Sequence, residues 1–249
     1  MRDILEAVAA GELSLESAEA RLAGYVTGEG GRFDATRERR SGVPEAVIGS
    51  GKTPAEVAAL AETSLETTGR AIVTRADDTT AAVVSDRADP AATVRYDDRT
   101  GVVVAHGPEY ERPTLDATVG VVTAGTSDAV PAGEAATVIR EMGATVVRVD
   151  DVGVASIARL TDQLDRLREQ DVLVVAAGRE GALPTVVAGL VDVPVIGLPV
   201  STGYGHGGDG EAALAGMLQS CTALSVVNVD AGFTAGVQAA LIARRIEAA

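Results

Sequence analysis

Residues able to do chemistry gather between residues 171 and 210, where two glycine-rich turns each follow a short apolar run. The first turn, Gly178–Gly181, carries a cation and a carboxylate, Arg179 and Glu180. The second, the loop Ser201–Gly210, holds five glycines together with hydroxyl, imidazole and carboxylate side chains. Glycine weakens structure unless the backbone must approach something closely. The two turns therefore predict a ligand site, against the alternative of a mobile surface connection.

The apolar runs before these turns have the composition of buried strands. Val172–Ala176 and Val193–Leu198 are rich in Val and almost wholly apolar, which is typical of strands that helices cover on both faces of a parallel sheet. Leu183–Val191 lies between them and is long enough for a short crossover helix, which completes a βαβ unit. Ligands of such sheets bind outside the carboxyl ends of the strands, and both turns emerge at that edge.

The same alternation of strand and helix runs through the whole second half of the chain. Expected strands are Val119–Thr123, Ala144–Val149, Val172–Ala176, Val193–Leu198 and Leu224–Val229, and expected helices cover residues 130–142, 155–169, 183–191, 210–220 and 234–246. Five strands, each followed by a helix, predict an α/β fold with a doubly wound five-stranded parallel sheet. The order 2-1-3-4-5, as in flavodoxin-like folds, is the common choice.

The first half predicts a helix over residues 1–24 and then a small mixed α/β domain. Its expected elements are strands at 44–48 and 71–75, helices at 54–66 and 78–86, and a hairpin of strands 93–96 and 101–105. The segment 107–113, with two prolines and several charges, marks a boundary that gives domains 1–112 and 113–249.

The run Ser50-Gly51-Lys52-Thr53-Pro54 has the look of a phosphate-binding P-loop, but the required earlier glycine is replaced by Ala46. A capping box explains it better, with Thr53 as N-cap, Pro54 at the first helical position and Glu56 at the third. Lys52 remains a candidate to contact an anion at this helix start.

Composition narrows the classes of partner. The net charge is −15, from 36 acidic and 21 basic residues, and this excludes nucleic acid and anionic membrane surfaces as expected partners. No run approaches the ~20 apolar residues that span a bilayer, and the start of the chain lacks a signal-peptide pattern. We therefore expect a cytoplasmic protein. The excess of acids and the single lysine, Lys52, also suggest a proteome adapted to high salt. A single cysteine, Cys221, leaves one thiol to explain.

The second half resembles the carboxylase domain that acts on aminoimidazole ribonucleotide in purine synthesis. The resemblance lies in the runs 122–128 (VTAGTSD), 177–184 (AGREGALP), 193–200 (VPVIGLPV) and 217–221 (MLQSC). The whole chain more closely resembles the LarB family, which takes part in the assembly of the nickel-pincer cofactor. That resemblance adds the signature from Phe33 to Glu45, the run 51–53, the loop 201–205 (STGYG) and the run 225–233 (SVVNVDAGF).

The LarB resemblance implies a reaction. Nicotinic acid adenine dinucleotide is carboxylated on its pyridinium ring with CO2 or bicarbonate as co-substrate, and its phosphoanhydride is cleaved. The products are pyridinium-3,5-biscarboxylic acid mononucleotide and AMP. An electron-poor ring cannot attack CO2 until a nucleophile has added to it, and a thiolate suits both addition and departure. Cys221 is the expected nucleophile, against the alternative of a buried small hydrophobe, and Glu180 is the expected base, against a plain surface residue.

Other residues are expected to bind the substrate. Ser127 and Asp128 follow the first strand, where they could hold a phosphate or a carboxylate or merely cap the next helix. Asp128 is also placed with the catalytic candidates, and Thr126 stands beside them. Arg179 suits bidentate pairing with a phosphate or carboxylate. The expected substrate-binding set is completed by Ser201, Thr202, Gly203, Tyr204, Gly205 and Lys52.

Cleavage of a phosphoanhydride implies Mg²⁺ shared with the substrate phosphates. Asp150, Asp151 and Asp209 are possible ligands, against solvated carboxylates. A His/Cys cluster for zinc and a serine-hydrolase elbow are both absent from the sequence.

Two rival functions stay open. A purine-pathway carboxylase or mutase would need the histidine that the purine family carries two residues before the proline of the turn, and Ala182 stands there. His206, in the loop, is not assumed to replace it. A non-catalytic nucleotide-binding sensor would not depend on Cys221. The resembled carboxylase domains share active sites between subunits, which implies a homo-oligomer of higher order than a dimer, such as an octamer.

Overall fold

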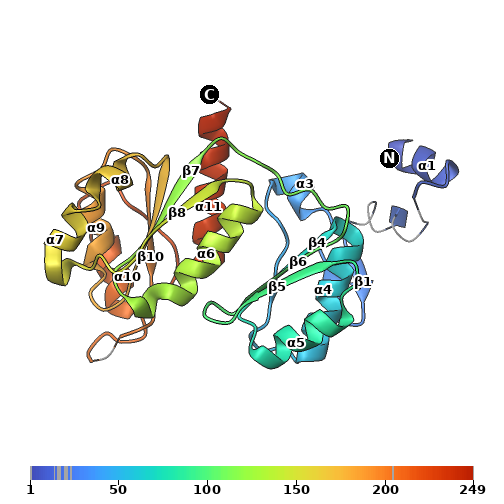
Figure 1. Cartoon of the computed structure of the whole chain (residues 1–249), viewed down its shortest axis with the longest axis horizontal. Coiled ribbons are helices and arrows are strands. Elements are labelled where there is room, and N and C mark those ends of the chain that lie inside the picture. Colours follow the sequence, from blue (N-terminus) through green and yellow to red (C-terminus); the bar gives the residue numbers. More distant parts are fainter. Residues whose placement is uncertain are drawn as a thin grey trace. The chain divides into compact units, whose positions relative to one another are not determined.

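The computed structural model describes residues 2–13, 15, 18, 19, 22, 24–203 and 205–248. The chain forms two compact units, Met1–Glu111 and Arg112–Ala249 (Figure 1). None of the helices within these described ranges is long and apolar enough to cross a membrane.

The first unit is built around a four-stranded mixed sheet with the order β3-β4-β6-β5. β3 and β4 are parallel, and the remaining pairs are antiparallel. The strands are β3 (Val47–Ile48), β4 (Arg70–Thr74), β5 (Thr93–Asp97) and β6 (Val102–His106), and the helices are α1 (Arg2–Ala9), α3 (Arg37–Ser41), α4 (Pro54–Thr68) and α5 (Asp78–Arg87). A separate hairpin is formed by β1 (Val26–Gly28) and β2 (Gly31–Phe33).

One helix prediction in this unit is wrong, and one is confirmed in detail. The helix expected over residues 1–24 is interrupted, because α1 ends at Ala9 and Gly11 adopts a φ of +76° in the turn that follows. Residues 15, 18, 19 and 22 are again helical, and the other residues from 14 to 23 lie outside the described part of the chain. At the start of α4 the expected capping box is present: Thr53 accepts from the Glu56 amide, and the Glu56 carboxylate accepts from the Thr53 amide at 2.8 Å. The Glu56 carboxylate accepts from both the Thr53 amide and the Thr53 hydroxyl, and these hydrogen bonds hold the pKa of Glu56 below its usual range.

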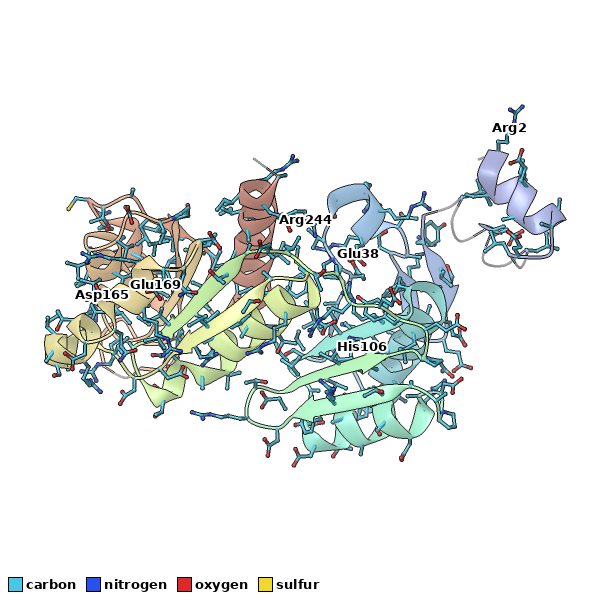
Figure 2. The ribbon with its side chains drawn as sticks, turned by 45° about the horizontal axis from the view of Figure 1, so that its top comes forward. Arg2, Glu38, His106, Asp165, Glu169 and Arg244 are labelled. Carbon is cyan, nitrogen blue, oxygen red and sulfur yellow. The ribbon has the colours of Figure 1, made fainter. Side chains whose placement is uncertain are left out.

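The signature between Phe33 and Glu45 forms ion pairs within this unit. Arg40 binds Asp34 at 2.6 Å, and this bond lowers the pKa of Asp34. Arg37 binds Glu45 at 2.7 Å. Further links run from α3 to the sheet, where Glu38 (labelled in Figure 2) binds the buried Arg70 at 2.9 Å. The described contacts of this signature are therefore structural.

The second unit contains a five-stranded, all-parallel sheet with the order β8-β7-β9-β10-β11. In chain order this is 2-1-3-4-5, so the predicted fold is confirmed. The strands are β7 (Thr118–Thr123), β8 (Thr145–Val149), β9 (Val172–Ala177), β10 (Val195–Pro199) and β11 (Ser225–Val226). The helices are η1 (Thr126–Asp128), α6 (Ala129–Glu141), η2 (Val154–Ser156), α7 (Ile157–Thr161), α8 (Leu164–Arg168), α9 (Ala182–Ala188), α10 (Glu211–Leu218) and α11 (Gly232–Glu247).

Helices cover both faces of this sheet (Figure 1). α6 and α11 pack closely on each other and on one face, and residues of α7, α8, α9 and α10 form a second apolar cluster on the other. β9 is buried along its whole length. Because both faces are covered, polar groups that bind a ligand must stand at an edge of the sheet.

Two predicted elements of this unit differ from those observed. The helix expected over 155–169 is broken between Thr161 and Leu164. Only Leu160 and Leu167 are buried in that stretch, so little packing favours one continuous helix. The strand expected over 224–229 is shorter in the structure, Ser225–Val226, and the chain then turns at Asp230, which adopts a φ of +53° before α11 begins.

Candidate active site

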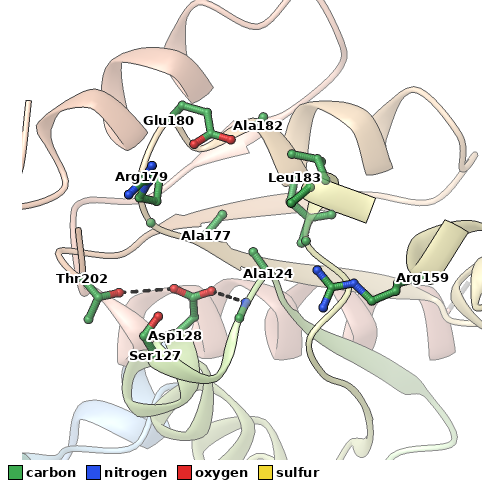
Figure 3. A pocket seen from close by; sticks show the side chains of 15 residues that line it. Ala124, Ser127, Asp128, Arg159, Ala177, Arg179, Glu180, Ala182, Leu183 and Thr202 are labelled. Atoms are coloured by element: carbon green, nitrogen blue, oxygen red, sulfur yellow. Dashed lines mark hydrogen bonds between the residues drawn. The ribbon is translucent and has the colours of Figure 1, made fainter. Parts of the chain in front are cut away.

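A pocket of about 390 Å³ opens at the carboxyl edge of the parallel sheet (Figure 3). Its walls come from the segments that follow four neighbouring strands: 124–128 after β7, 153–159 after β8, 177–183 after β9, and Thr202 after β10. Ser127, Asp128 and Thr202 stand on one wall, and Arg179 and Glu180 stand on the facing wall. The topology thus brings together residues that lie up to 78 positions apart in the chain, since Ala124 and Thr202 line one pocket.

Asp128 is the buried carboxylate of this pocket, with only 3% of its surface exposed. Its Oδ2 accepts from the Gly125 amide at 2.8 Å, and its Oδ1 accepts from the Thr202 hydroxyl at 3.4 Å. Burial raises the pKa of Asp128, while hydrogen bonds from the Gly125 amide and from Thr202 oppose that rise. Asp128 therefore closes the turn after β7 and links it to the loop after β10.

The turn after β9 presents Arg179 and Glu180 to solvent and to the pocket. Arg179 adopts a φ of +52°, a left-handed conformation that is costly for a residue with a side chain. Gly178 has no room for a side chain, because a Cβ there would overlap the backbone carbonyl of Thr202. The turn after β9 and the loop after β10 are thus in direct backbone contact, as their glycines suggested.

The same turn borders a second pocket of about 220 Å³. Arg179 and Glu180 line both pockets, and the second is completed by Gly203, His206 and the glycines that lead into α10. A ligand with two parts could lie across the turn, with one part on each side of Glu180.

Arg159 is a site residue that our sequence interpretation missed. It lies on α7 and reaches the pocket from the end opposite Arg179 (Figure 3). Its guanidinium binds Asp151 at 2.9 Å. Residues 155–169 carried no signal of a site, since an arginine in an amphipathic helix is ordinary surface.

Several other predicted residues lie outside the first pocket. Thr126 is exposed at the start of η1, and Gly205 is exposed with a φ of +91°. The Ser201 amide donates to Asp230, which lies before α11. Lys52 belongs to the first unit, where its ammonium donates to the Ile48 carbonyl at 2.8 Å. Tyr204 lies outside the described residues.

Cys221 is exposed and stands apart from this pocket. It follows α10 and precedes β11, so it lies in the connection that enters the amino end of that strand. Asp128, Arg179 and Glu180 all follow carboxyl ends of strands. Within one chain, the structure therefore places Cys221 and Glu180 at opposite edges of the sheet.

Of the carboxylates proposed as metal ligands, Asp150 and Asp151 form ion pairs with arginines, and Asp209 is exposed on a loop. Asp150 accepts from Arg148 at 2.6 Å and from the Thr123 hydroxyl at 3.1 Å, and Asp151 binds Arg159. Asp209 is exposed in the loop after β10. Across the part of the chain that the structure describes, no three His, Cys, Asp or Glu side chains gather in a way that could hold a metal ion. These residues do not fit a Mg²⁺ site built by this chain.

Comparison with known proteins agrees with the fold. Residues 118–249 match the AIR carboxylase family model, and residues 27–107 match the model of the LarB/PurE-like N-terminal domain. The second unit is therefore a carboxylase domain of the AIR carboxylase type, and both matches support a carboxylase-type function. The chain is 38% identical over 254 residues to "Uncharacterized protein MJ0165" of Methanocaldococcus jannaschii, and the match covers 98% of this chain and 97% of that protein. With both domains present in this order, the chain belongs to the LarB family.

Proposed function

We propose that this protein carboxylates the pyridinium ring of nicotinic acid adenine dinucleotide and hydrolyses its phosphoanhydride. The products are pyridinium-3,5-biscarboxylic acid mononucleotide and AMP. The observation that carries this proposal is Ala182 in the wall of the pocket. The purine carboxylases use a histidine there to move a proton, and a methyl group cannot do so. A carboxylase-type pocket without that imidazole must use other chemistry.

The reaction needs a nucleophile, and the thiolate of Cys221 supplies one. Its Sγ adds to a ring carbon, and the ring electrons move to give an enamine whose C5 is nucleophilic. C5 then forms a bond to the carbon of CO2. Glu180 accepts the proton from C5, the C–S bond breaks, and the returning electrons restore the aromatic ring. Water cleaves the phosphoanhydride and releases AMP.

The arginines and hydroxyls of the pocket suit the charges of this substrate. Arg179 can pair with a phosphate or with the ring carboxylate, and Ser127 offers a hydroxyl on the facing wall. The two pockets that share Arg179 and Glu180 also suit a dinucleotide, with one nucleotide half on each side of the turn.

The position of Cys221 supports a site that is completed by a second copy of the chain. Cys221 is exposed, and Leu218, three residues before it, is 64% exposed although it is a large apolar residue. An oligomer that buries this end of α10 would allow one subunit's thiol to reach another subunit's Glu180. We therefore propose a homo-oligomer of higher order, consistent with the sharing of sites that the carboxylase resemblance implies.

Mg²⁺ enters this proposal as a counterion of the substrate. The described carboxylates do not form a metal site, so we derive no step through a protein-bound ion. The pyrophosphate of the dinucleotide can bind Mg²⁺ itself, and the ion is included in the assay for that reason.

The test is mass spectrometry of the products after the purified protein is incubated with nicotinic acid adenine dinucleotide, ¹³C-bicarbonate and Mg²⁺ at high salt. We expect AMP and a mononucleotide heavier by one labelled carboxyl group. Cys221→Ser should abolish both products, and Glu180→Gln should reduce carboxylation by about 100-fold or more. Glu169→Gln is the matched control, because Glu169 follows α8 directly, does not line the pocket and is exposed (Figure 2).

Two results would contradict the proposal. Turnover of aminoimidazole ribonucleotide with the dinucleotide untouched would establish the purine carboxylase instead. Binding of nucleotides without turnover of either substrate, and unchanged by Cys221→Ser, would favour the sensor.

A further inference from the structure

The run Ser225–Phe233 was part of the LarB resemblance, yet neither pocket includes a residue from it. Within this run, Asp230 makes one hydrogen bond to the end of β10 and one to the first residue of the glycine-rich loop. Its amide donates to the Pro199 carbonyl at 2.9 Å, and its Oδ1 accepts from the Ser201 amide at 2.9 Å. Both bonds hold the point where β10 becomes the loop.

The carboxylate of Asp230 takes the place of a missing backbone acceptor. Alongside β10, the chain after β11 continues the parallel pairing through the Val227 amide and the Gly197 carbonyl, 3.1 Å apart. At Asp230 the backbone turns towards α11 with a φ of +53°. Its own side chain, rather than a further carbonyl, then accepts from the Ser201 amide. Asp and Asn are the residues that both tolerate this conformation and carry such an oxygen.

The other end of the loop, at Gly210, packs against Val229, the residue before Asp230. Gly210 has a φ of +81° and is buried, and a Cβ there would lie 2.5 Å from Cγ1 of Val229. The segment Val229–Asp230 therefore holds both ends of the loop Ser201–Gly210.

This loop delivers groups to both pockets. Thr202 follows Ser201 directly, donates its hydroxyl to Asp128 on the same wall of the first pocket, and contacts Gly178 through its carbonyl (Figure 3). The second pocket is lined from this loop by Gly203, His206, Gly207, Gly208 and Gly210. A shift of the loop at Ser201 would therefore move the residues that this loop contributes to each of the two pockets.

From these contacts we infer that Asp230 is a positioning residue of the site: its carboxylate fixes the stem of the loop Ser201–Gly210 and so places Thr202 against Asp128 and Gly178. The positioning itself is a property of the fold. Its effect on turnover rests on the proposed function.

Three substitutions separate the hydrogen bond from the backbone conformation. Asp230→Gly permits the positive φ and removes the acceptor, Asp230→Asn permits the φ and keeps an acceptor oxygen, and Asp230→Ala removes the acceptor and adds strain. Backbone hydrogen exchange of peptides covering residues 201–210 is the first readout. Loss of a charge-assisted bond should speed exchange at Ser201 by about tenfold or more in the glycine variant, and the asparagine variant should stay close to the wild type.

The second readout is turnover of the dinucleotide. We expect the kcat/KM of Asp230→Gly to fall by about tenfold, with recovery in Asp230→Asn and an unchanged Tm in both. Unchanged exchange over residues 201–210 in Asp230→Gly, or equal loss in the asparagine and glycine variants, would overturn the inference. Faster exchange in a protein that does not turn over the dinucleotide at all would support the positioning role and count against the proposed function. Should Asp230→Gly fail to fold, the exchange of Asp230→Ala against Asp230→Asn decides the same question.

Discussion

Asp128 is a buried carboxylate that joins two loops of the pocket. It is almost fully enclosed, yet its two oxygens accept from groups on different loops, Gly125 and Thr202. The bond to Thr202, at 3.4 Å, is the longer of the two and the one that a substrate hydroxyl or amide could replace. Because burial disfavours its charged form, Asp128 ties the stability of the site to pH.

Asp128→Asn should change the pH dependence of stability in a defined direction. Burial raises the pKa of Asp128 in the folded state, so the native protein binds this proton more tightly than the unfolded chain. The contribution of Asp128 to the free energy of unfolding is fully present below the pKa that it has in the unfolded chain. It is lost as the pH rises through the higher pKa that it has in the folded protein. The asparagine variant has no such charge and does not lose this stability. Its free energy of unfolding should therefore increase relative to that of the wild type as the pH rises across that window.

The measurement is urea unfolding of both proteins at several pH values from 4 upwards, a range chosen around the usual pKa of Asp, about 3.9. The comparison uses the change with pH rather than the absolute difference, because asparagine also alters the hydrogen bonds to Gly125 and Thr202. A constant difference at all pH values would show that Asp128 has the same pKa in both states.

At the scale of elements, the contact between the turn after β9 and the loop after β10 can be tested at Gly178. Alanine there would place a Cβ against the Thr202 carbonyl, which is backbone and cannot rotate away. We expect Gly178→Ala to destabilise the second unit by about 1–3 kcal/mol and to reduce turnover as the loop shifts. Gly189→Ala is the control, because a Cβ at Gly189 would meet its nearest atom at 3.5 Å. A stability of Gly178→Ala equal to that of the control would show that the two turns are not in contact.

The start of α4 offers a test in the first unit. Thr53 accepts from the Glu56 amide, and replacing it with alanine leaves that amide without its partner. Thr53→Ala should lower the stability of the first unit by about 1 kcal/mol. Thr79→Ala, at an exposed helical position of α5, should change it little. Thermal unfolding of both variants is the measurement, and equal Tm values would argue against the capping box.

The elements predictable from sequence were those with strong local signals. The buried valine-rich strands β7, β9 and β10 and the capped helix α4 follow from composition, spacing and capping residues that act within a few positions. The break in the 155–169 helix could not be predicted, because it depends on how few of its residues find a core to pack against. The site was predictable in part because the glycines on either side of Arg179 and Glu180 are also a local signal, which indicated a turn at the end of β9. Arg159 and Asp230 enter through contacts between distant segments, which leave no local pattern.

At the scale of the whole molecule, the proposed mechanism makes the placement of Cys221 a test of how the site is assembled. One chain carries Glu180 at the carboxyl edge of the sheet and Cys221 at the connection into the amino end of β11. A thiolate can add to a substrate held beside Glu180 only if the two groups come within bonding reach of the same ring. A site shared between copies of the chain satisfies that requirement without any change in the fold.

Mixed oligomers of two inactive variants test this directly. Glu180→Gln keeps the thiol and Cys221→Ser keeps the base, so Cys221→Ser alone should form no product and Glu180→Gln alone should retain about a hundredth of the activity or less. When the two are co-expressed, a shared site can combine the intact Cys221 of one chain with the intact Glu180 of another. With random mixing in equal amounts, about a quarter of the sites receive both groups, so activity should recover to roughly a quarter of the wild-type value.

The control replaces one partner by the double variant Glu180→Gln/Cys221→Ser, which supplies neither group and should give no recovery. Native mass spectrometry verifies that mixed oligomers have formed. If they form and remain inactive, then Cys221 and Glu180 must act from the same chain, and the connection between α10 and β11 would have to move to the carboxyl edge when substrate binds. Recovery in the mixed oligomers and none in the control would place the thiol and the base on different subunits, and would make oligomerisation a requirement of the chemistry rather than of stability alone.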